Sequence, residues 1–152
     1  MSEKSGKGRA SDSNHATVAS DEIRPLRLGM VGGGRDAFIG AVHRIAARMD
    51  NKFQLVAGAL SSTPEKALAS AADLGLAEAR AYSDFRQMAE REARLKDGIE
   101  AVAIVTPNHM HAPIAEEFLR RNIHVICDKP LTATLLEAKS LAKAAERSDA
   151  LF

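Results

Sequence analysis

The sequence predicts an α/β protein: a single domain with a doubly wound, mostly parallel sheet and helices on both of its faces. Two observations lead to this prediction. Short apolar runs alternate with longer segments of helical period from residue 26 onward, as expected for strands joined by right-handed helical crossovers. The first apolar run also ends in three consecutive glycines, 32–34, just before the first helical segment. With 152 residues, the chain has the length of one domain with one core.

The predicted strands are apolar runs that are too short to be helices. The run at 99–105 is apolar nearly throughout, apart from Glu100, as expected for a central parallel strand. A further strand is expected to begin at 150–152. The five complete strands are expected at 26–31, 53–60, 79–82, 99–105 and 124–127.

The predicted helices carry apolar residues at helical spacing between recognisable start and stop signals. In the second helix, Thr63 is the expected N-cap, Pro64 takes the first helical position and Gly75 follows the last turn. The expected spans are 37–49, 63–75, 84–95, 112–121 and 135–147. The apolar period is carried by Ile39, Val42, Ala46 and Met49 in the first helix, by Leu68, Ala71 and Ala72 in the second, and by Ala138, Leu141, Ala142 and Ala145 in the last.

The composition argues against several classes of function. The net charge is +1, so the chain has no field that would attract nucleic acid or an anionic membrane. Aromatic residues make up 4% and tryptophan is absent, which disfavours stacking on bases. No apolar run approaches the roughly 18 residues of a membrane helix. Cys127 is the only cysteine, so we expect no internal disulfide and a reducing, cytoplasmic location.

Residues 1–22 are rich in Ser, Lys, Gly, Asp and Asn and contain almost no large apolar side chain. Such a composition cannot offset the entropy lost on ordering, so we expect a disordered leader. It also lacks the apolar core of a secretory signal. The folded domain is therefore expected over residues 23–152.

The glycine-rich turn fits the pattern G-x-G-x-x-A. Gly32 permits a tight turn, Gly34 lets the backbone approach a pyrophosphate, and Ala37 lets the helix pack close to the strand. The N–H groups at the start of that helix would face the phosphates. The strand before the turn and the helix after it favour dinucleotide binding.

Four loops follow predicted strands and are expected to meet at one edge of the sheet, because parallel strands end together. Ligands of such sheets bind outside the carboxyl ends of the strands, near the switch in strand order. The loops are Gly32–Ala37, Ser61–Ser62, Thr106–Asn108 and Asp128–Pro130.

With these loops in order, residues 24–152 resemble the N-terminal Rossmann domain of the Gfo/Idh/MocA oxidoreductases. The motifs are Gly32-x-Gly34-x-x-Ala37, Thr106-Pro107-Asn108-x-x-His111 and Asp128-Lys129-Pro130. The resemblance implies a bound nicotinamide dinucleotide and hydride transfer to or from sugars, inositols or related polyols. It also implies a second, substrate-binding domain, which would have to follow residue 152, and an oligomer in the full-length protein. Asp128 departs from the glutamate that is usual in the family.

The resemblance makes Lys129 the catalytic candidate, since the family's lysine reaches the nicotinamide ribose and the substrate hydroxyl. Its ammonium could stabilise an alkoxide or relay a proton, and Pro130 would fix the turn that aims it. His111 is implied to stabilise its loop or to contact the cofactor. His109 and His111 are a poor zinc site because a closed site needs four ligands, so no metal is expected.

The end of the second strand bears on the choice of cofactor. NAD-binding folds usually carry an acid there, but this chain has Ser61 and Ser62 and no carboxylate before Glu65. The serines can donate to a 2′-phosphate, and Lys66 or Arg35 could add positive charge. NADP is therefore slightly favoured over NAD.

Two other functions stay open. A binding module could hold a dinucleotide without turnover, and other doubly wound proteins bind nucleotide-sugars or acyl-CoA, which the Asp-Lys-Pro loop disfavours. Three features outside the motifs are expected to be structural: His43 is packed or capping, Cys127 is buried and inert, and the charges at 91–96 lie on a solvated helix face.

Overall fold

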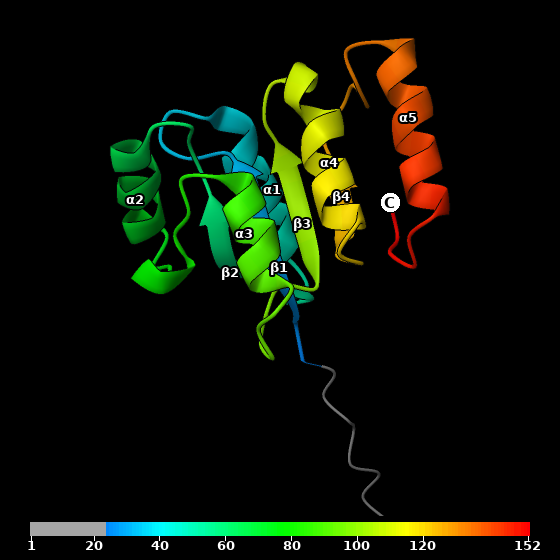
Figure 1. Cartoon of the computed structure of the whole chain (residues 1–152). Helices are drawn as coiled ribbons and strands as arrows, with labels where there is room; N and C mark the ends of the chain where they lie inside the picture. The colour runs from blue at the N-terminus through cyan, green and yellow to red at the C-terminus, as the bar shows by residue number, and fades with distance from the viewer. Residues whose placement is uncertain (1–23) are drawn as a thin grey trace, which may run out of the picture.

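Four parallel strands form the centre of the molecule in the computed structural model, which describes residues 24–152 (Figure 1). Their order is β2-β1-β3-β4, so the direction of succession reverses between β1 and β3. Val31 pairs with both Ala59 and Ile104, so the strands end together at what we call the carboxyl edge; the opposite edge is the amino edge. The strands are β1 (Leu26–Gly32), β2 (Phe53–Ala59), β3 (Ala101–Val105) and β4 (His124–Cys127).

Helices cover both faces of this sheet, as predicted. In Figure 1, α3 and α4 lie in front of the strands and α1 lies behind them. No helix in the described part of the chain is long and apolar enough to cross a membrane. The helices are α1 (Phe38–Arg48), α2 (Pro64–Asp73), α3 (Phe85–Glu92), α4 (His111–Leu119) and α5 (Leu135–Glu146), with 3₁₀ turns η1 (Glu78–Arg80) and η2 (Asn108–Met110).

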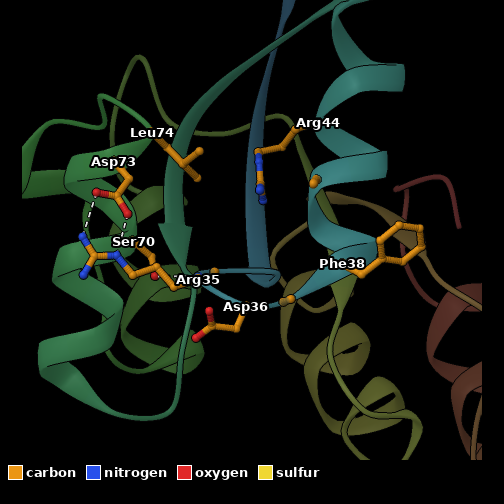
Figure 2. Close-up of a pocket in the computed structure, with 10 residues that line it drawn as sticks. Arg35, Asp36, Phe38, Arg44, Ser70, Asp73 and Leu74 are labelled. Atoms are coloured by element: carbon orange, nitrogen blue, oxygen red, sulfur yellow. Dashed lines mark hydrogen bonds and ion pairs between the residues drawn. The ribbon is translucent and has the colours of Figure 1, made fainter.

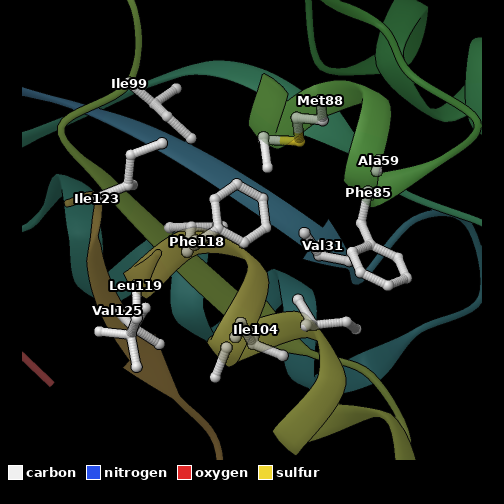
Figure 3. Close-up of a cluster of buried hydrophobic side chains, with 14 of the residues drawn as sticks. Val31, Ala59, Phe85, Met88, Ile99, Ile104, Phe118, Leu119, Ile123 and Val125 are labelled. Atoms are coloured by element: carbon white, nitrogen blue, oxygen red, sulfur yellow. The ribbon is translucent and has the colours of Figure 1, made fainter. Parts of the chain in front are cut away.

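The two faces of the sheet carry separate apolar clusters because successive strand residues point to opposite sides. In β3, Val102 and Ile104 pack with α3 and α4, whereas Ala101 and Ala103 pack on the side of α1. Figure 3 shows the first cluster, in which Phe118 is fully buried. The inward faces of α3 and α4 complete this cluster, with Phe85, Met88, Ala89, Ile114, Ala115, Phe118 and Leu119 all buried.

The closest contact of helix α1 with the rest of the domain is made by a glycine, and not by the apolar stripe that the sequence predicts. A Cβ on Gly33 would lie 2.8 Å from the Cα of Gly40, so only two glycines allow this approach. Gly40 therefore faces inward, and most of the predicted stripe turns outward: Val42 and Ala46 are exposed and Met49 is 82% exposed, whereas Ile39 is half-buried and packs against the core as predicted. The sequence assigned this close packing to Ala37, and the structure shows that Gly40 makes such a contact.

Helix α2 is also partly rotated from the predicted orientation, whereas α5 lies mostly as predicted. Ala67, Ser70 and Ala71 are buried in α2, whereas Leu68 and Ala72 are exposed. Thr63 stands at the N-cap without a side-chain cap bond. In α5, Leu141 is buried as predicted, Ala138 and Ala145 are half-buried, and Ala142 is exposed. Gly75 has a positive φ after α2, as its predicted closing role requires, and Asn122 has one after α4.

Two predicted strands are absent from the described residues. The segment 79–82 contains part of the 3₁₀ turn η1, followed by one isolated bridge from Ala81 to Gly58. Bonds from the Arg80 side chain to Glu92 and Asp97 hold this segment in a turn. Residues 150–152 form no strand, although the Val125 N–H donates to the Leu151 carbonyl oxygen at 2.9 Å. The predicted leader, residues 1–22, lies outside the described residues.

Glu92 is the largest departure from the predicted solvated face at 91–96. Arg91, Arg94 and Lys96 are exposed, but Glu92 is 1% exposed. Its carboxylate accepts from Arg80 Nε at 2.6 Å, from Tyr82 Oη at 2.7 Å and from the Ile99 N–H at 3.1 Å. Burial, with the bond to Glu92, raises the pKa of Tyr82 to about 12. The acid is buried because three donors replace its water.

Candidate functional site

The four predicted loops converge at the carboxyl edge, and backbone hydrogen bonds join them. The Gly34 N–H donates to the Leu60 carbonyl oxygen at 3.1 Å, which holds the glycine turn against the end of β2. The Asp128 N–H donates to the Ile104 carbonyl oxygen at 3.0 Å, which holds the third and fourth loops together. The prediction that these loops share one edge is confirmed.

A cleft of about 600 Å³ opens between the first three of these loops; the Asp-Lys-Pro loop does not line it. It lies across the point where the strand order reverses, between β1 and β3. Of the predicted cofactor residues, it is lined by Gly32, Ala37, Ser61, Ser62, Thr106 and Pro107. Gly33 of the glycine turn also lines it, and so do Ser83 and Asp84, which sequence reasoning missed because their position depends on the path of the chain between η1 and α3.

The glycine turn has the conformation that its sequence predicts, but not every glycine has the predicted task. Gly32 and Gly33 have φ of +80° and +72°, a region that residues with a Cβ rarely adopt. A Cβ on Gly34 would lie 2.6 Å from both the Leu60 carbonyl oxygen and Ser70 Oγ. Gly34 is thus required for the fold itself, independently of any phosphate.

The start of α1 is open to an anion. Ala37 at its N-cap makes no side-chain cap bond, and the first turn has no acidic residue. By contrast, Asp84 caps α3 through the N–H groups of Arg86 and Gln87, and Thr134 caps α5. A helix start with free N–H groups beside a glycine turn suits a phosphate, because those groups and the helix dipole both favour negative charge.

Thr106, at the end of β3, holds the one buried side-chain N or O atom in the described residues that lacks a hydrogen-bond partner, its Oγ1. The residue lines the cleft and contacts the glycine turn, where a Cβ on Gly32 would approach its Cγ2 to 2.9 Å. Leaving a hydroxyl unpaired costs about 1–3 kcal/mol. Such a cost suggests a partner that comes from outside the chain.

His111 joins the third loop to the fourth. It is 1% exposed, with Nδ1 2.9 Å from the Pro130 carbonyl oxygen and Nε2 2.8 Å from that of Thr106. A neutral imidazole carries one N–H and can donate to only one of them. His111 does not line the cleft, so its geometry matches the predicted loop-stabilising role rather than contact with a cofactor.

The Asp-Lys-Pro loop presents its lysine to solvent. Lys129 is exposed and makes no ion pair within residues 24–152, and the peptide bond to Pro130 is cis. Asp128 is half-buried, with Oδ1 3.8 Å from His43 Nε2 of α1, so His43 is packed as predicted.

Burial, with the nearby carboxylate of Asp128, raises the pKa of Cys127 to about 11, which keeps its thiol protonated and inert at neutral pH.

Beyond β2, the two cations expected near a 2′-phosphate already have partners, and Figure 2 shows the pair of Arg35 with Asp73. Arg35 Nη2 donates to Asp73 Oδ1 at 2.8 Å, and this bond lowers the pKa of the Asp73 carboxyl. Lys66 Nζ donates to Asp36 Oδ2 at 3.0 Å. Both pairs connect the glycine turn to α2, so neither cation is free in the way that the NADP prediction assumed.

The remaining predicted positions surround the cleft without lining it. Gly34 and Arg35 line a neighbouring hollow of about 380 Å³, shown in Figure 2. Asn108 begins η2 and is exposed. In residues 24–152, no three His, Cys, Asp or Glu side chains are grouped closely enough to hold a metal ion.

Comparison with known proteins identifies a family over almost all of the described chain. The model of a family described as "Oxidoreductase family, NAD-binding Rossmann fold" matches residues 26–152. An uncharacterized oxidoreductase of Bacillus subtilis, YfiI, is 42% identical over 125 residues, which are 82% of this chain and 32% of the relative.

Solved structures give the same picture. An oxidoreductase from Sinorhizobium meliloti is 70% identical with a TM-score of 0.82, over 85% of this chain and 36% of that one. An inositol dehydrogenase homolog from Azotobacter vinelandii, solved with NADH and myo-inositol, is 44% identical with a TM-score of 0.79, over 82% of this chain and 33% of that one. The present chain thus spans about a third of the length of these relatives.

Proposed function

We propose, from the premise that this chain belongs to the Gfo/Idh/MocA oxidoreductase family, that it is the dinucleotide-binding part of a dehydrogenase. The substrate class is a sugar, an inositol or a related polyol, and the reaction is hydride transfer to or from a nicotinamide cofactor, NAD or NADP. The observation that carries this proposal is the uncapped start of α1 beside the glycine turn, in the cleft at the strand-order reversal.

The residues of the cleft fit a dinucleotide. The turn at Gly32 and the free N–H groups of α1 suit the pyrophosphate, and the serines after β2 suit the adenosine ribose. The unpaired Thr106 hydroxyl provides a hydrogen-bonding group on the side of β3. When bound, the nicotinamide supplies the acceptor or donor of the hydride. The chain's own contribution is to orient the nicotinamide and to hold a charged side chain beside it.

Lys129 is the proposed catalytic residue. Its exposed ammonium, free of an ion pair in residues 24–152, can stabilise negative charge on the substrate oxygen or pass a proton to it. The loop around it is positioned by two contacts: the Asp128 N–H on Ile104 and the Pro130 carbonyl oxygen beside His111. The myo-inositol complex of the Azotobacter vinelandii relative supports the polyol class.

The first test is cofactor binding. Titration calorimetry of this chain with NADH and NADPH should detect binding of at least one of them. A folded chain that binds neither would contradict the dinucleotide site.

The second test uses the longer protein that contains this chain. Lys129→Met keeps the length of the side chain and removes its charge, so turnover should fall by about 10²- to 10⁴-fold while dinucleotide affinity stays near that of the wild type. Lys139→Met, a lysine of α5 outside the loop, is the control and should keep its rate. Turnover of Lys129→Met within about threefold of wild type would remove the lysine from the chemistry and favour a binding module without turnover.

A further inference from the structure

Asp36 is a carboxylate that no motif of the sequence assigns. It lies in the turn between β1 and α1 with a φ of +65°, and its side chain is 86% exposed. Its single described ion pair is with Lys66, whose Nζ donates to Oδ2 at 3.0 Å. Figure 2 shows Asp36 on the loop that faces α2, away from Phe38.

Backbone contacts fix the place of this carboxylate. The Gly34 N–H is bonded to Leu60, the residue before Ser61, and the Arg35 N–H donates to Ser70 Oγ of α2 at 3.0 Å. The turn therefore lies against the end of β2, and Asp36 reaches the first turn of α2. Asp36 lines the hollow next to the cleft, beside the end of β2, where an acid would normally meet the ribose.

The charges of this region oppose a 2′-phosphate. Asp36 supplies an anion from the opposite loop, although β2 itself ends without one. Lys66 is neutralised by Asp36, and Arg35 is held by Asp73. A ribose 2′-hydroxyl could donate to the Asp36 carboxylate, whereas a phosphate dianion would be repelled by it.

We infer, on the basis of the proposed function, that the Asp36–Lys66 pair selects the cofactor and makes this site favour NAD over NADP. Asp36 takes the place of the acid that β2 lacks. Lys66 partly neutralises the Asp36 carboxylate and so determines the negative charge that a ligand experiences. The preference for NADP that the two serines suggest is thereby reversed.

The test measures dissociation constants for NADH and NADPH on the chain and on four variants. Wild type should bind NADH more tightly. Asp36→Asn should shift the preference toward NADPH by about tenfold or more, because the repulsion disappears and Lys66 is released. Asparagine tolerates the left-handed conformation, so the turn should keep its shape. Glu90→Gln removes one exposed, ion-paired acid from α3 and should leave the preference unchanged.

Lys66→Met distinguishes the contribution of Lys66 to the cofactor preference from that of Asp36. It leaves Asp36 without its partner, so the preference for NADH should increase. In the double variant Asp36→Asn/Lys66→Met, most of the gain in NADPH affinity should be lost, because the released cation is gone. The shift in Asp36→Asn should also shrink when salt is raised from about 0.05 M to about 0.5 M, as a Coulombic effect must.

The failures of this inference and of the proposed function are distinguishable. A wild type that binds neither dinucleotide overturns both. A wild type that binds NADPH more tightly than NADH, or an Asp36→Asn variant with an unchanged preference, overturns the role of the pair and leaves the dinucleotide site intact.

Discussion

The amino and carboxyl edges of the sheet use similar polar residues in opposite ways. At the amino edge, Glu92 and Glu100 are each surrounded by donors from the chain. Glu100 accepts from the Arg24 guanidinium at 2.7 Å and from the Arg27 N–H at 3.0 Å, and these bonds lower its pKa to about 2. At the carboxyl edge, the Thr106 hydroxyl has no partner within residues 24–152, and α1 begins without a cap.

The difference separates residues that stabilise the fold from residues that are available to a ligand. A polar group whose partners are all internal contributes to stability and gains little from a ligand. A buried polar group without a hydrogen-bond partner lowers the stability of the fold, and a ligand that supplies the partner is bound more tightly. Variants at the two edges should therefore have different effects: the amino edge should affect unfolding, and the carboxyl edge should affect binding.

The largest effect is expected at Glu92. Glu92→Ala removes the acceptor of Arg80, of Tyr82 and of the Ile99 N–H at once, so the free energy of unfolding should fall by about 3–5 kcal/mol in urea titrations. Glu90→Ala, two residues earlier on the same helix and exposed, should cost less than about 0.5 kcal/mol. Equal losses in the two variants would mean that the buried acid has no special role at the amino edge.

A smaller effect is expected at Glu100, and it depends on pH. Because the folded pKa is lowered, the carboxylate stabilises the fold above its unfolded pKa, and this contribution is lost as pH falls from about 5 to about 2. The loss should be about 1–2 kcal/mol, since the side chain is 26% exposed and solvent screens part of the shift. In urea unfolding at a series of pH values, Glu100→Gln should show a flatter acid limb than wild type. Identical limbs would contradict this assignment.

The smallest effect is expected at Thr106, where stability and binding should move in opposite directions. Thr106→Val keeps the shape and removes the unpaired hydroxyl, so stability should stay the same or rise by up to about 1 kcal/mol. Affinity for the dinucleotide should fall by about three- to tenfold, as for the loss of one hydrogen bond. The free energy of unfolding and the dissociation constant should be measured on the same variant, because the comparison of the two edges depends on both. An unchanged affinity would mean that Thr106 has only a structural role.

The alternation of strands and helices and the meeting of the four loops could be predicted from the sequence, because both follow from periodicity and from parallel topology. Helix rotation could not. Which side of α1 faces the sheet depends on the contact between Gly33 and Gly40, and an apolar stripe at Val42 and Met49 suggests the opposite side. The pattern fails here because backbone contact, rather than side-chain burial, sets the rotation.

Charged residues were predicted least well, for a related reason. The sequence around Glu92 looks like a solvated face, and its burial depends on donors from η1 and from the start of β3, which are distant along the chain. Likewise, Lys66 and Arg35 look free in the sequence, but the turn brings Asp36 to the first and α2 brings Asp73 to the second. Partners of this kind are fixed by the tertiary fold alone.

The contact between Gly33 and Gly40 has a consequence for the dynamics of the site. With the Cα atoms of the turn and of α1 in contact, the turn cannot move without carrying the whole helix, and the helix is packed on β2 and β3. The N–H groups that face the cleft are therefore preorganised before any ligand arrives. Binding then costs little conformational entropy at this position, so more of the interaction free energy is expressed as affinity.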